Sequence, residues 1–354
     1  MNLIDLGWDP YFEEKFEPHK NKNLVPLRIT RENRRDYLAC GESGEYRCEV
    51  SGRFRFEADN RGKFPTVGDW VAASLPPDGG TAVIHNLLPR KSAFLRKTAG
   101  ENTEEQVVAS NIDTVFIVCG LDNNFSPRRI ERYLSLTWES GAVPVVLLNK
   151  ADLCPEAAER QEEIEAIAIG AAVHAISAAT NQGLETVRSH IPAGRTAAFL
   201  GSSGVGKSTI INALLGEERL SVGEVREDDS RGRHTTTSRE LILLPDKGIV
   251  IDTPGMRELQ VWGDESGLKQ AFDDIEGLAG RCRFRNCGHL KEPGCAVQGA
   301  IADGSLDPGR YRSYLKLKKE LHYLAARQNI KANLMEKKKW KKISILAKNY
   351  KKEG

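Results

Sequence analysis

A glycine-rich run at residues 201–208, Gly-Ser-Ser-Gly-Val-Gly-Lys-Ser, is the strongest chemical signal in this chain. It fits the pattern G-x-x-x-x-G-K-[ST], in which glycines let backbone N–H groups close around phosphates. An apolar strand-like segment precedes it and a helical pattern follows it, which is the context of a P-loop. Lys207 is expected to reach the β- and γ-phosphates, and Ser208 to bind Mg²⁺. The candidate phosphate-binding residues are Gly201, Ser202, Ser203, Gly204, Val205, Gly206, Lys207, Ser208 and Thr209.

The motif Asp252-Thr-Pro-Gly255 ends another apolar segment, residues 248–251. A carboxylate at this place can hold the Mg²⁺ shell, and the N–H of Gly255 can meet the γ-phosphate. Alone the motif is weak, because Asp-x-Pro-Gly is also a common turn. Downstream of a P-loop it indicates a second phosphate-side element, with Asp252 and Gly255 as nucleotide-binding candidates.

The motif Asn149-Lys150-Ala151-Asp152 lies at the end of the apolar segment 143–149. An aspartate there can accept hydrogen bonds from N1–H and N2–H₂ of guanine, whereas adenine would leave the carboxylate unpaired. Lys150 can lie over the base, and Ser177-Ala178 can offer a backbone N–H to the guanine carbonyl. By itself this tetrapeptide is equally well an exposed loop. Together with the P-loop it predicts a guanine site formed by Asn149, Lys150, Asp152, Ser177 and Ala178.

The order of these motifs is unusual for a GTPase, because the base-binding motifs precede the phosphate-binding ones. The same sheet can form if the chain is cut elsewhere, so the order predicts a circular permutation. The switch loop and the motif at 252–255 then lead directly into the C-terminal region. Nucleotide state can therefore act on that region, since switch segments order around the γ-phosphate.

The charged segment 217–240 is expected to be a mobile loop that contains the first switch. Within it, Thr236 is the candidate to complete the Mg²⁺ coordination, with Thr235 as the alternative. Many GTPases place a water-orienting Gln just after the second phosphate motif, but here that residue is Met256. The hypothesis is that His234 orients the water, so the catalytic candidates are His234, Lys207 and Thr236. The alternative is that His234 is a solvent-facing loop residue.

Three cysteines and one histidine follow the spacing Cys282-x4-Cys287-x-His289-x5-Cys295. Three thiolates and an imidazole suit tetrahedral Zn²⁺, and four protein ligands leave no open position. The spacing therefore predicts a structural zinc. Four further basic residues are expected on the surface of this loop: Arg281, Arg283, Arg285 and Lys291.

The elements that must position these motifs fall into successive regions. Residues 1–30 are expected to be an extension with one amphipathic helix, around residues 3–16. Residues 31–108 are β-rich with turn signals, which predicts a small barrel or sandwich, and this region resembles an OB-fold. Residues 109–262 alternate strands and helices, which predicts a parallel α/β sheet closed by a hairpin over LILLP and GIVID. Residues 263–354 are expected to be a zinc-binding helical domain with a basic tail.

Composition narrows the class of protein and its partners. With 354 residues, 40% hydrophobic and 28% charged, the chain is expected to be a multidomain globular protein rather than a fibrous one. It has no apolar membrane span or secretory signal, and its seven Cys do not form a disulfide pattern, so we expect a cytoplasmic protein. Residues 310–354 carry 15 Lys or Arg against 3 Glu, although the whole chain is only +2. This asymmetry suggests a polyanionic partner, or else a solvated basic tail.

The barrel region offers a second basic surface, in which arginines and lysines alternate with phenylalanines. Such a face can bind RNA, but the same alternation can place the aromatic rings in the barrel core. The residues concerned are Arg53, Phe54, Arg55, Phe56, Arg61, Lys63 and Phe64.

With these motifs in hand, the chain resembles the ribosome small-subunit-dependent GTPase A family (RsgA/YjeQ) over nearly its whole length. The resemblance is carried by the ordered motifs RKSAFLRK, NKAD, SA, GSSGVGKS, GRHTTT, DTPGMRE and the Cys/His spacing with PGCA. It implies an OB-fold, a permuted GTPase domain and a zinc-binding helical domain. It also implies binding to the 30S subunit and its 16S rRNA, a role in late 30S maturation, and ribosome-stimulated GTP hydrolysis. His234 falls where the family's suspected catalytic His lies.

We therefore expect a monomeric GTP phosphohydrolase that needs Mg²⁺ with GTP and one structural Zn²⁺, and that has no membrane partner. Two alternatives remain open: a GTP-sensing rRNA-binding assembly factor with little turnover, and an assembly GTPase of the large subunit. ATP use is disfavoured by Asp152.

Overall fold

The computed structural model describes residues 2–33, 36–58, 60–76, 80–97, 105–220, 239–252, 265–323 and 326. They divide into two compact units, Met1–Gln260 and Val261–Gly354. Within these described ranges, no helix is both long enough and apolar enough to cross a bilayer. The lysine-rich end of the chain and most of the predicted switch loop lie outside them.

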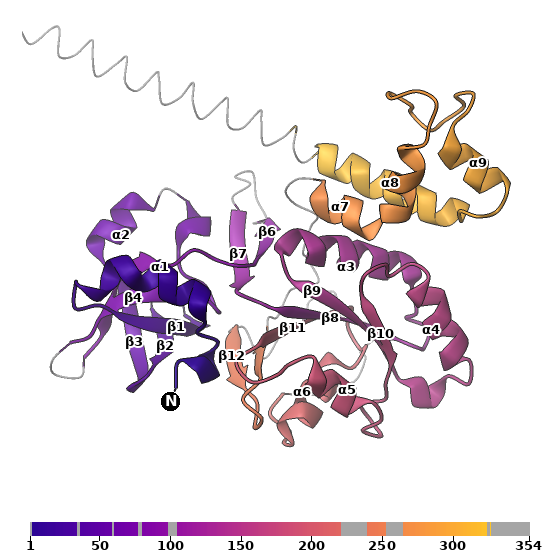
Figure 1. Cartoon of the computed structure of the whole chain (residues 1–354). Helices are drawn as coiled ribbons and strands as arrows, with labels where there is room; N and C mark the ends of the chain where they lie inside the picture. The colour runs from indigo at the N-terminus through magenta and orange to yellow at the C-terminus, as the bar shows by residue number, and fades with distance from the viewer. Residues whose placement is uncertain are drawn as a thin grey trace, which may run out of the picture. The chain divides into compact units, whose positions relative to one another are not determined.

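The first unit begins with a five-stranded barrel, as predicted. Its strands are β1 (Val25–Glu32), β2 (Tyr37–Gly41), β3 (Gly44–Val50), β4 (Trp70–Ser74) and β5 (Ala82–Leu87). They pair in the order β1-β2-β3-β5-β4, and an antiparallel pairing of β1 with β4 closes the barrel (Figure 1). Strand β1 begins at Val25 and so extends across the boundary expected at residue 30.

The N-terminal helix lies later than predicted. A 3-10 turn, η1 (Ile4–Leu6), ends at Gly7, whose φ of 86° suits glycine. Helix α1 (Pro10–Lys20) follows, because Asp9 caps it and Pro10 occupies its first turn. Its Phe12 and Phe16 join Trp8 and Trp70 in a buried cluster, so the extension packs against the barrel.

The alternating segment that contains Phe54 and Phe56 lies in the region expected to be β-rich but forms helix α2 (Gly52–Glu57). Ser51 caps the helix by accepting the N–H of Phe54, which overrides the alternation. Residues two apart point to different sides of a helix, so Phe54 packs against the barrel core with Phe64 nearby. Phe56 is instead 91% exposed.

The predicted α/β sheet is confirmed. Its strands are β8 (Thr114–Gly120), β9 (Val143–Asn149), β10 (Ala172–Ala175), β11 (Thr196–Leu200), β12 (Glu240–Leu243) and β13 (Ile249–Asp252). The order is β10-β9-β8-β11-β13-β12, with all pairs parallel except the β12–β13 hairpin.

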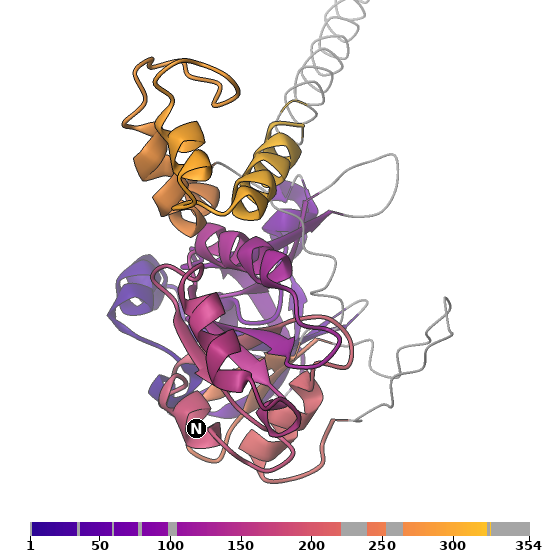
Figure 2. The same ribbon diagram turned by 90° about the vertical axis from the view of Figure 1, so that its right-hand side faces the viewer.

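Helices cover both faces of this sheet. Helix α3 (Pro127–Ser140) lies on one face, and α5 (Leu184–Ser189) and α6 (Lys207–Leu215) lie on the other; α4 (Ala157–Glu165) packs near β10 (Figure 1 and Figure 2). The buried core between the strands and helices α5 and α6 includes Phe116, Phe199 and Ile210. This packing makes the strand ends a rigid edge for the loops that follow them.

The barrel and the α/β sheet are joined edge to edge. Strand β12 pairs with β1 at Glu240 and Arg31, whose side chains also form an ion pair at 2.7 Å. A separate hairpin of β6 (Ala93–Lys97) and β7 (Glu105–Ser110) connects the two parts of the chain. Strand β12 begins where the predicted switch loop ends, so the strand that continues from that loop shares one sheet with the barrel.

The second unit is helical and contains the Cys/His motif. It holds α7 (Ser266–Ala271), α8 (Asp273–Ala279) and α9 (Ala296–Ala302), and residues 308–323 are also helical. Buried Arg310 donates to both carboxylate oxygens of Asp274 at 2.7 Å and stacks on Phe272. These contacts hold the last described helix against α8.

Candidate nucleotide site and metal cluster

The motifs predicted to bind a nucleotide meet at one edge of the α/β sheet. Strands β9, β11 and β13 run parallel. Strands β9 and β13 end on the first residue of their motifs, Asn149 and Asp252, and β11 ends at Leu200, directly before the glycine loop. Since the carboxyl ends of parallel strands share an edge, the shuffled order along the chain does not separate the motifs in space. This edge is the usual place for a ligand in an open α/β sheet.

The loop at 201–208 has the conformation that its glycines allow. Gly201, Gly204 and Gly206 have φ values of 152°, 73° and 95°. A Cβ at Gly201 would clash with the carbonyl of Val118, and one at Gly206 with the side-chain amide of Asn149. Lys207 begins α6, and its Nζ donates to the carbonyls of Gly201 and Ser202 at 2.8 and 2.6 Å. The loop therefore curls around the ammonium group, with the N-terminus of α6 behind it.

Asn149 ties the phosphate loop to the base-binding loop. Its Nδ2 donates to the carbonyl of Val205 at 2.8 Å, and its Oδ1 accepts the N–H of Ala178 at 3.0 Å. The side chain is only 2% exposed. One buried amide thus sets the spacing between two loops that lie far apart in sequence.

The remaining base-side candidates surround this amide. Lys150 has a φ of 69° and forms an ion pair with Asp122 at 2.6 Å. Asp152 is exposed in the 3-10 turn η3 (Ala151–Leu153), and the N–H of Ala151 donates to the carbonyl of Ile176, next to buried Ser177. The turn at Asp152 and the loop at Ser177 are therefore neighbours.

Asp252 lies on the phosphate side, close to Lys207. Burial raises the pKa of its carboxyl group, and the charge of Lys207 opposes that rise. Gly255, His234 and Thr236 lie outside the described residues, so their predicted roles rest on sequence alone.

Two side chains that no sequence motif identified support the phosphate loop from the segment after β8. Arg129 of α3 donates to the hydroxyl of Ser202 at 3.0 Å and to Oδ1 of Asn124 at 2.5 Å. Nδ2 of Asn124 in turn donates to the carbonyl of Ser203 at 3.3 Å. No pattern in the sequence pointed to them, because their contacts cross more than 70 residues.

The four predicted metal ligands do come together in the second unit. The ligand atoms of Cys282, Cys287, His289 and Cys295 all lie within 4.8 Å of one another. Nδ1 of His289 is 3.5 Å from the sulfurs of Cys282 and Cys295, which are themselves 3.9 Å apart. A tetrahedral zinc with Zn–S of about 2.3 Å and Zn–N of about 2.0 Å requires S···S and S···N separations of about 3.8 and 3.5 Å. The donor set and its spacing therefore fit Zn²⁺.

A carboxylate that the sequence analysis did not identify organises the loop between these ligands. Glu292 accepts the backbone N–H groups of Gly288, Leu290 and Lys291 at 2.8, 2.8 and 3.0 Å. Hydrogen bonds from backbone N–H groups, beginning with its own, lower the pKa of Glu292 to about 2. It helps to hold a backbone in which His289 has a φ of 55°.

The surface of this loop is basic and partly apolar. All four predicted basic residues, Arg281, Arg283, Arg285 and Lys291, are exposed. Phe284 and Leu290 are 42% and 69% exposed. Such a surface suits a polyanion with accessible bases.

Comparison with known proteins gives matches over nearly the full chain. A family model described as RsgA GTPase matches residues 87–262. A protein of Opitutus terrae, named Small ribosomal subunit biogenesis GTPase RsgA, is 45% identical over 97% of this chain and 96% of its own length. The crystal structure of YjeQ from Thermotoga maritima is similar with a TM-score of 0.64 and 28% identity, covering 84% of this chain and 98% of that one. YloQ, described as a circularly permuted GTPase, gives a TM-score of 0.61 and 26% identity, covering 87% and 98%.

Proposed function

Since this chain belongs to the RsgA/YjeQ family of circularly permuted GTPases, we propose that it hydrolyses GTP to GDP and phosphate during late maturation of the small ribosomal subunit. The observation that carries this proposal is the 45% identity, over 97% of the chain, to a protein named for small ribosomal subunit biogenesis. The convergence of three strand-end motifs on one sheet edge supports a nucleotide site there.

In the proposed mechanism, the glycine loop and Lys207 bind the phosphates, and Asp152 recognises guanine with help from Ala178. Mg²⁺, which would be held by Ser208 and Thr236, supplies charge neutralisation at the β- and γ-phosphates. Asp252 would hold the hydration shell of that ion, and its partly buried position beside Lys207 supports this placement. His234 orients the attacking water, in the absence of a Gln at position 256. Because a loop residue must be positioned for this task, intrinsic hydrolysis is slow and a partner accelerates it.

The proposed partner is the 30S subunit with its 16S rRNA, and the protein acts as a cytoplasmic monomer. The exposed basic loop around the Cys/His cluster supports contact with RNA, as does the basic end of the chain. Phosphate contacts of this kind make binding strongly dependent on salt. Zn²⁺ bound by the four ligands is structural, since no ligand position remains open.

We also propose that the chain has four regions with separate roles. Residues 1–30 form an extension, 31–108 an OB-fold that binds RNA, 109–262 the GTPase domain, and 263–354 a zinc-binding domain with a basic tail. The edge-to-edge pairing of β12 with β1 supports a direct link from the switch region to the RNA-binding barrel.

The test is nucleotide hydrolysis with purified 30S, 50S and 70S particles, each with GTP and ATP at two salt concentrations. We expect 30S-dependent stimulation with GTP only, weaker at the higher salt. Stimulation by 50S alone would favour the large-subunit alternative. No stimulation by any saturating particle would favour a GTP sensor with little turnover, and stimulated turnover unchanged in His234→Ala would exclude the catalytic role of that residue.

A further inference from the structure

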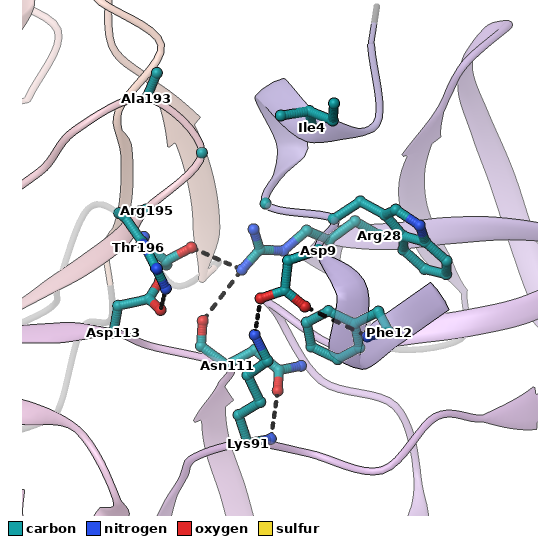
Figure 3. A pocket seen from close by; sticks show the side chains of 13 residues that line it. Ile4, Asp9, Phe12, Arg28, Lys91, Asn111, Asp113, Ala193, Arg195 and Thr196 are labelled. Carbon is teal, nitrogen blue, oxygen red and sulfur yellow. Dashed lines mark hydrogen bonds and ion pairs between the residues drawn. The ribbon is translucent and has the colours of Figure 1, made fainter. Parts of the chain in front are cut away.

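A cavity of about 160 Å³ lies between the barrel, the N-terminal extension and the GTPase sheet. Figure 3 shows that its walls come from Ile4, Asp9 and Phe12 of the extension, Arg28 of β1, and the residues just before β8 and β11. Those residues, Asp113 and 193–196, lie at the starts of parallel strands whose ends carry the nucleotide motifs. The cavity is therefore at the opposite edge of the sheet from the phosphate loop.

The guanidinium of Arg28 closes this cavity, and its side chain is 1% exposed. It donates to the carbonyls of Leu6, Gly68 and Asn111 and to the hydroxyl of Thr196. All four acceptors are neutral, and no carboxylate among the described residues lies within ion-pair distance of Arg28. One N–H on Nη1 has no acceptor in that part of the chain. Burial of the guanidinium lowers the pKa of Arg28 to about 10, and the charges of Asp113, Asp69 and Asp9 oppose this shift from a distance. A buried cation with no carboxylate in contact is costly, so this geometry favours an added anion.

The other charges that line the cavity cancel in pairs. Lys91 forms an ion pair with Asp9, and Arg195 forms one with Asp113 at 2.8 Å. Arg28 is thus the one lining charge left without an ionic partner among the described residues. The lining has a net charge of about +1, concentrated at the buried guanidinium.

We propose that this cavity binds a small tetrahedral oxyanion of the phosphate class against Arg28. Its volume resembles that of an engineered cavity of about 150 Å³ that holds benzene, so a five-atom anion fits and a nucleotide does not. The bound anion contacts groups from the extension, the barrel and the GTPase sheet together. Bound phosphate therefore stabilises the packing of these three parts against one another.

The test measures inorganic phosphate binding by calorimetry and thermal unfolding of the full chain, against sodium chloride at equal ionic strength. All variants carry Lys207→Ala, so that phosphate at the nucleotide loop does not contribute. Dimethyl phosphate serves as a second probe, because it represents an RNA backbone phosphate rather than a free oxyanion. We expect saturable binding and a rise in Tm with inorganic phosphate, and no comparable effect with dimethyl phosphate.

Two substitutions change the lining charge in opposite directions. Asp9→Asn keeps the side-chain oxygen that caps α1 but raises the net charge by one, and Lys91→Gln lowers it by one. One charge about 6 Å away, at an effective dielectric constant of about 40, changes affinity by about tenfold. We expect phosphate to bind about tenfold more tightly to Asp9→Asn and about tenfold more weakly to Lys91→Gln. Glu57→Gln, which removes a charge from the exposed Arg53–Glu57 pair on α2, is the matched control and leaves the affinity unchanged.

Arg28→Met removes the guanidinium and should abolish phosphate binding. If that variant does not fold, the opposite responses of Asp9→Asn and Lys91→Gln still decide the matter. Absence of saturable phosphate binding in the Lys207→Ala background would overturn the proposal. Equal affinities in Asp9→Asn, Lys91→Gln and Glu57→Gln would overturn it as well, as would preferential binding of dimethyl phosphate.

Discussion

The amide of Asn149 offers the sharpest test of how the nucleotide site is built. Asn149→Ala removes the donor to the Val205 carbonyl and the acceptor of the Ala178 N–H, and both contacts are buried. Each buried group left without a partner costs about 1–3 kcal/mol, so the two together cost about 2–6 kcal/mol. Part of this cost lowers the free energy of unfolding and part weakens nucleotide binding, because the same two loops form the predicted GTP site. If half of it appears in binding, GTP affinity falls by about 5- to 150-fold.

A matched control exists on the helix that follows the phosphate loop. Asn212 also makes two side-chain hydrogen bonds, both to the backbone of Leu220 at 2.8 Å, and is 8% exposed. Asn212→Ala therefore removes the same chemistry away from the predicted base site. Urea unfolding should show comparable losses of stability for the two variants, of at least about 2 kcal/mol. Titration with a fluorescent GTP analogue should show weakened binding for Asn149→Ala only.

Two results would refute this reasoning. Equal loss of GTP affinity in both variants would mean that general destabilisation, and not loop spacing, sets the affinity. Unchanged GTP affinity in Asn149→Ala, with reduced stability, would mean that the two loops do not need this amide to bind nucleotide.

Three further predictions concern base choice, metal retention and pH. Asp152→Asn should lose the preference for GTP over ATP in competition binding, and an unchanged preference would remove Asp152 from the guanine site. Glu292→Gln should release zinc to a chelator more readily, with about 10- to 100-fold weaker binding, because the carboxylate no longer holds three backbone N–H groups of the ligand loop; retention equal to wild type would contradict this. His174 and His190 have Nε2 atoms 3.0 Å apart, and burial lowers the pKa of each below its ordinary value. The unfolded chain therefore takes up protons first, so the free energy of unfolding should decrease as pH falls through about 6.5. The double variant His174→Gln/His190→Gln should flatten this dependence in urea unfolding, and an identical slope would exclude the pair as its source.

The sequence was sufficient wherever a pattern is local or strongly periodic. The predicted strands and helices of the α/β region were found, including α3 over Pro127–Ser140, because buried parallel strands and amphipathic helices leave long signatures. The Cys/His cluster was predicted from spacing, since its four ligands lie within one short loop. The glycine loop was also predictable, because its backbone demands specific residues at fixed intervals.

Predictions from the local sequence pattern were wrong where a helix cap or a partner strand decided the secondary structure. Residues 52–57 alternate like a strand but form α2, because Ser51 caps a helix there. The β-barrel was expected to begin at residue 31, yet Val25 already pairs with Ala73 of β4. In both places a hydrogen-bond partner outside the local pattern of apolar residues decided the outcome, namely the Ser51 hydroxyl in one and strand β4 in the other.

The sequence by itself determined which groups are available for chemistry and the local loops that hold them. These are the glycine-rich loop at 201–208, the tetrapeptide 149–152 and the four Cys and His metal ligands. Only the tertiary structure decided that Arg129 supports the phosphate loop, that Asn149 spaces two loops, and that Arg28 lies buried beside a cavity. The physical reason is distance along the chain. Motifs are held by neighbouring backbone, whereas these contacts join segments whose approach is set by the packing of a whole sheet and barrel.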